Sequence, residues 1–195
     1  MILNYADIWR PQRRTSAITY DLFLILAGSL LIAMTAQLSF TIGPVPVTGQ
    51  TFGVLIVGAL LGWRRGGTAV LLYLFEGGVL NLPVFAGGTF GFQTFFGPTG
   101  GYLISFLPAA MLVGWLAEKG WDRHILSTVM AMIAGNVVIY LFGVPWLRTV
   151  LAVSWQDAFS FGLTPFLLGD LFKVMLAALL LPLVWNLMGT RQQPT

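Results

Sequence analysis

The sequence predicts an all-α integral membrane protein with six transmembrane helices and both termini in the cytoplasm. Of its 195 residues, 57% are hydrophobic and only 9% are charged, whereas charged residues make up about a quarter of an ordinary soluble domain. The mean hydropathy is +0.84. Six apolar runs, and a one-sided distribution of basic residues between them, predict the number of helices and their orientation.

The six apolar runs give the predicted helices in chain order. They are Tyr20–Phe40, Gly49–Trp63, Gly66–Val79, Gly100–Ala117, His124–Val144 and Thr164–Met188. The second and third are shorter than the roughly 20 residues of a full crossing, so we expect them to be tilted, interrupted or buried among the others. Residues 1–19, which lack the apolar core of a cleavable signal peptide, and residues 189–195 are expected to be cytoplasmic tails around one membrane domain, residues 20–188.

The basic residues set the orientation of this domain. With a cytoplasmic N-terminus, only Arg148 falls outside, and Lys173 lies within the last span. Eight basic residues fall inside: Arg10, Arg13, Arg14, Arg64, Arg65, Lys119, Arg123 and Arg191. Because they lie in short loops and tails rather than along one stripe, membrane topology explains the pI of 9.6 better than binding of nucleic acid does.

Several classes of function lack the residues that they need. Cysteine is absent and histidine occurs once, as His124, so the sequence predicts no metal site of the Cys/His kind. There is no GxxxxGK[ST] phosphate loop, so ATP-driven uptake would need the ATPase of another chain. A rhomboid-like serine protease would need its histidine inside the membrane, but His124 lies at the predicted cytoplasmic edge of the fifth span.

Two of the predicted outer loops contain no charged residue. They are "TIGPVPVTG", residues 41–49, which we call the first lid, and "NLPVFAGGTFGFQTFFGPTG", residues 81–100, the second lid. Apolar, non-helical backbone is tolerated at membrane depth when protein buries it or when it lines a cavity. We therefore expect both lids to fold inward.

The last span carries an acid and a base, Asp170 and Lys173, in its outer third. The spacing of three residues places both on one helical face. A charge near the bilayer centre costs from about 2.5 kcal/mol upward, so such residues normally face a bundle interior or a cavity and mark a pathway or ligand site. The alternative is a neutralised pair that serves only packing or register.

Further polar side chains are predicted at the same membrane level. They are Glu76 and Asn81 at the end of the third span, Asn136 and Tyr140 on the fifth, and Gln50, Gln93 and Tyr102 beside the lids. Together with the acid and base they suit a small ligand that has an apolar body and separated polar ends. Taken singly, the tyrosines could be interface anchors, Asn136 an interhelical hydrogen bond and Asn81 a turn residue.

The first span carries small residues on one face: Ser29, Ala33 and Ala36. Such a face lets another helix backbone approach closely. It predicts either packing within the chain or an interface with a partner membrane protein.

Three Gly/Pro-rich strings make the sequence resemble a known family. They are "GPVPVTGQTFGVLIVGALLG" (residues 43–62), "LPVFAGG" (82–88) and "GPTGGYLISF" (97–106), followed by the acid and base of "LGDLFK" (168–173). In this order they resemble the BioY family, the biotin-specific S components of energy-coupling factor (ECF) vitamin transporters. The resemblance extends from about the first span to the last.

The resemblance implies the ECF S-component fold in a bacterial cytoplasmic membrane and capture of biotin from outside, without a cofactor or catalysis. It implies three partners, a membrane T component and two cytoplasmic ATPases, and ligand contacts by Asp170 and Lys173. Asn81 lies directly before the second matching string, where the third helix of the family meets its lid. Tyr102 falls within the third string and is assigned a pocket-lining role. A solitary biotin carrier, or an ion-coupled carrier with a proton relay of Glu76, Asp170 and Lys173, remains an alternative.

Overall fold

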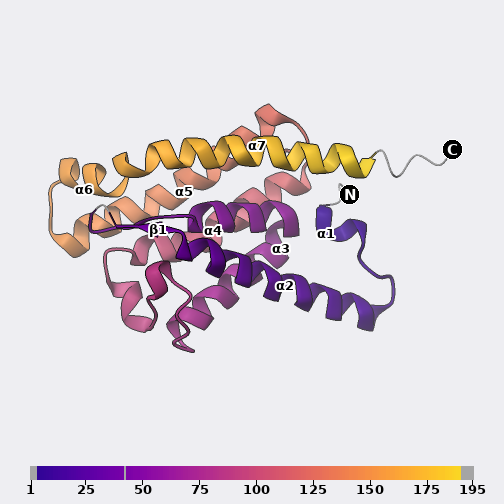
Figure 1. Cartoon of the computed structure of the whole chain (residues 1–195), viewed down its shortest axis with the longest axis horizontal. Helices are drawn as coiled ribbons and strands as arrows, with labels where there is room; N and C mark the ends of the chain where they lie inside the picture. Colours follow the sequence, from indigo (N-terminus) through magenta and orange to yellow (C-terminus); the bar gives the residue numbers. More distant parts are fainter. Residues whose placement is uncertain (1–3, 42, 190–195) are drawn as a thin grey trace.

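The computed structural model describes residues 4–41 and 43–189, which form an α-helical bundle with its long helices roughly along the longest axis (Figure 1). The helices are α1 (Tyr5–Ile8), α2 (Arg14–Gln37), α3 (Gln50–Gly78), α4 (Gly100–Glu118), α5 (Ile125–Leu151), α6 (Trp155–Gly162) and α7 (Leu167–Gly189). Short 3-10 helices are η1 (Ala86–Gly88), η2 (Phe92–Phe96) and η3 (Thr164–Phe166). A two-residue hairpin pairs β1 (Ser39–Phe40) with β2 (Val47–Thr48).

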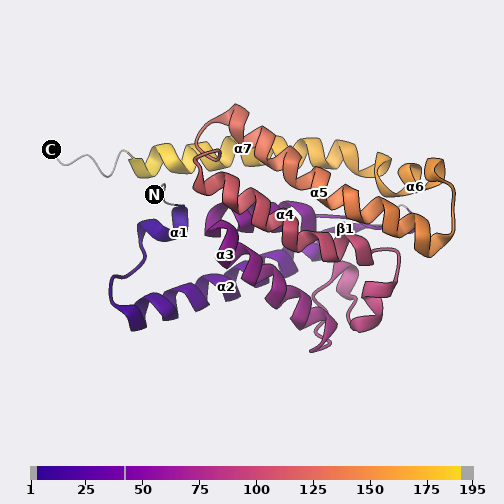
Figure 2. The same cartoon turned by 180° about the vertical axis from the view of Figure 1, so that it is seen from behind.

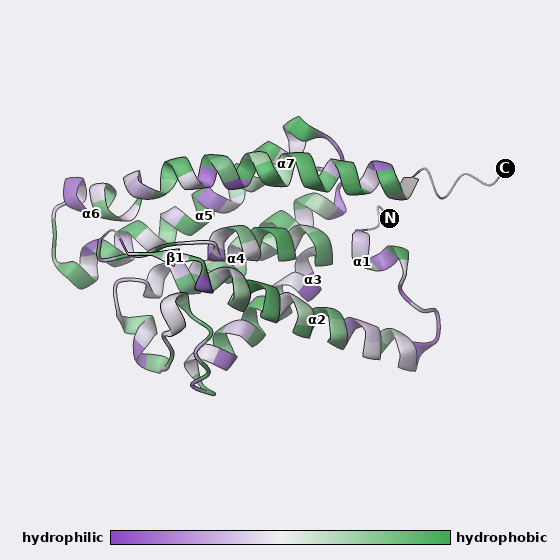
Figure 3. Cartoon of the chain, in the orientation of Figure 1, coloured by the Kyte–Doolittle hydropathy of each residue, from purple (hydrophilic) through white to green (hydrophobic). Residues whose placement is uncertain are grey.

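In this part of the chain, five helical segments are long and apolar enough to cross a membrane. They are Arg14–Gln37, Gln50–Gly78, Gly100–Glu118, Ile125–Leu151 and Trp155–Leu187. Hydrophobic residues dominate their surfaces in Figure 3, whereas hydrophilic ones gather at α1 and in the segment that joins it to α2. The chain is therefore a multi-pass membrane protein, as its composition predicts.

The predicted second and third helices correspond to the two arms of α3. Gly62 breaks the helix, because its φ of +80° lies in the left-handed region that favours glycine. A Cβ atom on Gly66 would lie 2.9 Å from the Cα atom of Gly58, although eight residues of straight helix span about 12 Å. The second arm therefore folds back along the first.

The other boundaries differ from the predictions mainly at helix ends. Helix α2 begins at Arg14 rather than Tyr20, so residues 14–19 belong to the bundle and not to a tail. Helix α5 continues through Pro145 and ends at Leu151, before Ala152 with φ 53°. Prolines are tolerated inside membrane helices, which is why ending the prediction at Val144 was wrong. Residues 190–195 of the predicted C-terminal tail lie outside the described residues.

The N-terminal segment packs onto the bundle instead of hanging free. Asn4, 2% exposed, donates from Nδ2 to the Leu61 carbonyl at 3.3 Å, beside the break in α3. Tyr5 donates to the Leu181 carbonyl of α7. Consequently α1 and the last turns of α7 lie at one end of the molecule, with α6 and β1 at the opposite end (Figures 1 and 2).

The small-residue face of α2 packs inside the chain. Ser29 and Ala36 are fully buried and Ala33 is 8% exposed. The hydroxyl of Ser29 donates to Glu76 of α3, and a Cβ atom on the neighbouring Gly28 would lie 3.0 Å from that of Ala69. This packing agrees with the first of the two predicted alternatives, contact within the chain, because α3 covers this face of α2. An interface of these residues with a partner membrane protein stays a prediction.

Candidate functional site

The acid and base of α7 belong to a four-residue polar network drawn from three helices. Lys173 donates from Nζ to Asp170 Oδ1 at 3.0 Å and to Thr51 Oγ1 of α3 at 2.8 Å. Tyr140 of α5 donates its hydroxyl proton to Asp170 Oδ2. Each carboxylate oxygen of Asp170, a residue only 6% exposed, therefore has a partner. We call these four residues the acid–base network.

The helix ends explain why a buried carboxylate is tolerated at this position. Asp170 lies in the first turn of α7, where the helix dipole stabilises a negative charge. The ion pair with Lys173 offsets a further part of the desolvation cost. Thr51 lies in the first turn of α3, so the ammonium group of Lys173 ties the starts of two helices together.

A cavity lies beside this network, and we call it the main cavity. Its walls come from the first lid, the starts of α3 and α4, α5 and η3, and they include Val45, Gln50, Thr51, Tyr102, Tyr140 and Phe166. Its volume is about 40 Å³, against about 300–1,000 Å³ for typical small-molecule pockets. A vitamin-sized ligand therefore requires one or more of these walls to move.

Four aromatic residues line the main cavity, among them Tyr102 and Phe166. Tyr102 stacks on Phe166 with ring centroids 6.3 Å apart. Its hydroxyl donates to the Gly162 carbonyl at 2.8 Å and is thus occupied by a contact with α6. Tyr102 thus lines the main cavity while its hydroxyl is bonded to α6, and its contact with a ligand stays a prediction.

Gln50 connects the main cavity with both lids. Its Oε1 accepts from Thr48 of the first lid at 3.2 Å, and its Nε2 donates to the Tyr73 hydroxyl at 2.5 Å. Tyr73 in turn donates to the Val84 carbonyl of the second lid at 3.2 Å. A displacement of the first lid therefore breaks a hydrogen bond of Gln50, and a displacement of the second lid breaks one of its partner Tyr73.

Asn136 borders a second, smaller cavity on the other side of Thr51. Its walls include Thr51, Phe52, Leu55, Asn136 and Lys173, and its volume is about 10 Å³. Asn136 is 9% exposed, and its side chain makes no hydrogen bond to any residue that the structure describes. The prediction that Asn136 lies near Lys173 agrees with this geometry.

Two predicted site residues lie elsewhere. The carboxylate of Glu76 accepts from Ser29 on α2, on the side of α3 that packs away from α7. Asn81 is exposed, has a left-handed φ of 56° and donates only to the Val79 carbonyl at 3.4 Å. Neither lines the two cavities. A shared membrane level is not a shared side of the bundle, which is why these two side chains lie apart from the cavities. That Glu76 and Asn81 contact the ligand stays a prediction, because the walls of the main cavity must move before a ligand of this size fits.

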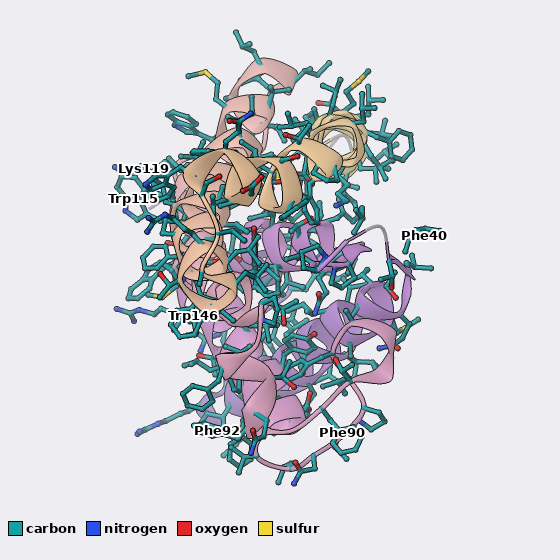
Figure 4. All side chains as sticks on the ribbon, turned by 90° about the vertical axis from the view of Figure 1, so that its left-hand side faces the viewer. Phe40, Phe90, Phe92, Trp115, Lys119 and Trp146 are labelled. Atoms are coloured by element: carbon teal, nitrogen blue, oxygen red, sulfur yellow. The ribbon has the colours of Figure 1, made fainter. Side chains whose placement is uncertain are left out.

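The lids fold differently from one another. Val45 of the first lid is 6% exposed and lines the main cavity, as expected. The second lid instead packs on the second arm of α3, where Phe85 and Phe95 lie so close that Cβ atoms on Gly77 and Gly78 would meet their rings at 2.4 Å. In Figure 4, Phe90 and Phe92 of this lid lie at the periphery of the bundle, on the side away from α7.

Thr51 was missed by sequence reasoning. A threonine in an apolar helix usually bonds its own backbone, as Thr68 does to the Arg64 carbonyl. Its position beside Gln50 in the string "GQT" was the only signal available. Among the described residues, no group of three or more His, Asp or Glu residues could hold a metal ion, and His124 lies exposed before the start of α5, remote from the network.

Comparisons with known proteins agree on one family. The profile of the BioY family matches residues 10–190. The chain is 37% identical over 172 residues to the biotin transporter BioY of Rhizobium etli, covering 83% of this chain and 91% of that protein. It is 39% identical over 159 residues to the biotin transporter BioY of Thermotoga maritima, covering 80% and 92%. Both relatives are transporters by name, and neither is an enzyme.

A solved structure has the same fold. It is the crystal structure of the S-component for biotin from an ECF-type ABC transporter, with a TM-score of 0.79 and 24% identity, covering 90% of this chain and 95% of that one. The family match spans nearly the whole membrane domain, including both lids and the acid–base network. The chain is a member of the BioY family.

Proposed function

We propose that this chain is the biotin-binding S component of an ECF-type uptake system. The observation that carries the proposal is the acid–base network beside an aromatic cavity, in a chain whose relatives are biotin transporters. Biotin itself is the ligand, and no cofactor is needed for its capture.

The chemistry of biotin suits this site. Its ureido group has two N–H donors and one carbonyl acceptor, and its tail ends in a carboxylate. A carboxylate such as that of Asp170 accepts from N–H groups in charge-assisted hydrogen bonds, and an ammonium such as that of Lys173 donates to a carbonyl or carboxylate. In the structure these two groups and Tyr140 satisfy one another, so biotin binds by replacing contacts already present rather than by filling unpaired positions.

Entry requires the first lid to move. Val45, Pro46 and Thr48 of this lid form one wall of the main cavity, whereas the second lid is held on α3 by Phe85 and Phe95. The hairpin of β1 and β2 joins only two residues on each side, so few hydrogen bonds oppose its displacement. Closure over bound biotin excludes water and strengthens the polar contacts.

We infer six crossings with both termini in the cytoplasm of a bacterium, in its cytoplasmic membrane. The two arms of α3 supply two crossings, with Gly62 at the cytoplasmic side, and this supports a count of six from five helical segments. Arg64 and Arg65 lie two and three residues after Gly62, in agreement with the positive-inside rule.

We further propose that a T component and two ATPases complete the transporter. The solved relative is a component of an ABC transporter by its title, and this sequence contains no phosphate loop. The ion-coupled alternative is weakened because Glu76 pairs with Ser29 and not with the acid–base network. Uptake that survives a proton uncoupler while ATP is abundant, and stops when a partner ATPase is inactivated, supports the ATP-driven system; the reverse result supports the relay.

Calorimetric titration of the purified chain with biotin tests the ligand. Wild type is expected to bind biotin but not thiamine or riboflavin. An Asp170→Asn variant is expected to bind about ten- to a hundredfold more weakly, because it loses charge-assisted hydrogen bonds. Asp157→Asn, on exposed α6, is the matched control. Folded wild type that does not bind biotin contradicts the proposed function, and unchanged binding by Asp170→Asn makes the network purely structural.

A further inference from the structure

The ammonium group of Lys173 is held by more than its ion pair. An ammonium has three N–H donors. One donates to Asp170 and a second to Thr51, which belongs to α3 and lies 122 residues away in the sequence. The Thr51 bond is 2.8 Å long and the Asp170 bond 3.0 Å, so the ammonium group is held by α3 as well as by α7.

Asn136 faces the remaining side of the same group. It lines the second cavity together with Lys173 and Thr51, it is 9% exposed, and its side chain makes no hydrogen bond to the residues that the structure describes. A buried amide of this kind normally has a partner. The cavity, at about 10 Å³, has close to the volume that one water molecule needs, and its three polar side chains are the number of partners that such a water usually has.

We infer that Thr51 and Asn136 are positioning residues for Lys173, Thr51 by a direct hydrogen bond and Asn136 through one bridging water. Together they hold the ammonium group at the junction of the two cavities, and they thereby set the affinity for the anionic or carbonyl group of the ligand. This inference rests on the proposed function for its ligand, but the placement of Lys173 can be tested without biotin.

The composition of the chain allows a direct spectroscopic test. Lysine occurs only twice, at Lys119 and Lys173. Lys119 lies with its Nζ 3.8 Å from the ring centroid of Trp115, remote from the site (Figure 4). Protein labelled with ¹³C and ¹⁵N in lysine alone therefore gives two side-chain signals, and a Lys119→Arg variant assigns them.

The variants to compare are Thr51→Val, which keeps the shape but removes the acceptor, Thr51→Ser, which restores it, and Asn136→Leu. Thr68→Val is the control, because Thr68 lies on the same helix and bonds only the Arg64 carbonyl. We expect Thr51→Val and Asn136→Leu to shift the Lys173 signal and leave the Lys119 signal in place. Biotin affinity is expected to fall about tenfold or more in Thr51→Val and to recover in Thr51→Ser, with Thr68→Val like wild type.

A Lys173 signal that stays in place in Thr51→Val or in Asn136→Leu overturns the positioning role of that residue. A shifted signal with unchanged biotin affinity overturns the link to the ligand. Wild type that fails to bind biotin would contradict the proposed function instead, and the spectra would still decide where Lys173 is held.

Discussion

At the scale of single residues, Tyr140 is the side chain whose removal leaves one oxygen of the Asp170 carboxylate without a hydrogen-bond donor. Its hydroxyl is the partner of Oδ2, while Lys173 bonds only Oδ1. Tyr140→Phe leaves a buried, charged acceptor without a partner, which costs about 1–3 kcal/mol. We expect a lower melting temperature in detergent. Tyr20→Phe, at a half-buried tyrosine on α2, is the control, and equal melting temperatures for both variants would contradict the assignment.

Asp122 gives the protein a pH-dependent stability outside the membrane spans. It precedes α5, is 2% exposed, and accepts from Trp185 Nε1 at 2.7 Å. Burial raises the pKa of its carboxyl group to about 6, although the bond from Trp185 opposes this. Since an unfolded aspartate has a pKa of about 3.9, the folded protein binds the extra proton. This stabilisation is complete below about pH 4 and is lost as the pH rises through about 6.

Asp122→Asn is therefore expected to remove part of the pH dependence. The amide cannot ionise, so on the order of 2 kcal/mol of destabilisation between about pH 4 and pH 7 should disappear, while the amide oxygen can still accept from Trp185. Unfolding free energies measured at a series of pH values in detergent give the slope. A variant with the slope of wild type would mean that Asp122 is not the group responsible.

At the scale of elements, the break in α3 depends on Gly62. A Cβ atom there would lie 2.3 Å from Glu118 Oε1 and 2.4 Å from Asn4 Nδ2, and the φ of +80° disfavours any other residue. Gly62→Ala is expected to destabilise the protein by at least about 1–3 kcal/mol. Gly169→Ala is the control, because a Cβ atom on this helical glycine would meet nothing within 4 Å. It is expected to stabilise by about 0.5–1 kcal/mol, and equal effects of both substitutions on the melting temperature would contradict the account.

Apolar runs bounded by charged residues or by Gly and Pro predicted the long helices, because the local composition determines where each long helix forms. The run Gly100–Ala117 matches α4 to within one residue. The short helices depend on individual contacts, which cannot be predicted from local composition. Helix α6 begins where the Ser154 hydroxyl accepts from the Asp157 backbone at 3.1 Å. Helix α1 is held by hydrogen bonds to the carbonyl groups of Leu61 and Leu181.

The sequence predicted how far along its helix each candidate site residue lies, but not which side of that helix faces the site. Sequence position predicted one common level for Gln50, Asn136, Asp170 and Lys173, and these residues lie at or beside the two cavities. Glu76 has the same level, but its helix arm faces α2. Which side of a helix faces which neighbour depends on packing between all the helices, and the nearly uniform apolar surface of a membrane helix gives little amphipathic signal of it.

At the scale of the whole molecule, the number of crossings decides which surface meets which solvent. With six crossings, the break in α3 near Arg64 and the segment with His124 are cytoplasmic, while Gln93 of the second lid and Gln156 of α6 are outside. With five, in which α3 crosses only once, everything after α3 is inverted: Gln93 and Gln156 would be inside and His124 outside. Arg123 would then also be outside, against the positive-inside rule.

The absence of cysteine makes the wild-type chain a ready background for single-cysteine variants at these four positions, all exposed in the structure. In intact cells, a membrane-impermeant maleimide is expected to label Gln93→Cys and Gln156→Cys, and to label Arg64→Cys and His124→Cys only after permeabilisation. Labelling of His124→Cys together with protection of Gln93→Cys would contradict six crossings with a cytoplasmic N-terminus and, if α3 crosses only once, move the second lid and α6 to the cytoplasmic side while the first lid stays outside. Biotin could not then enter from outside through the first lid, because that lid and α6 would no longer share one face of the membrane.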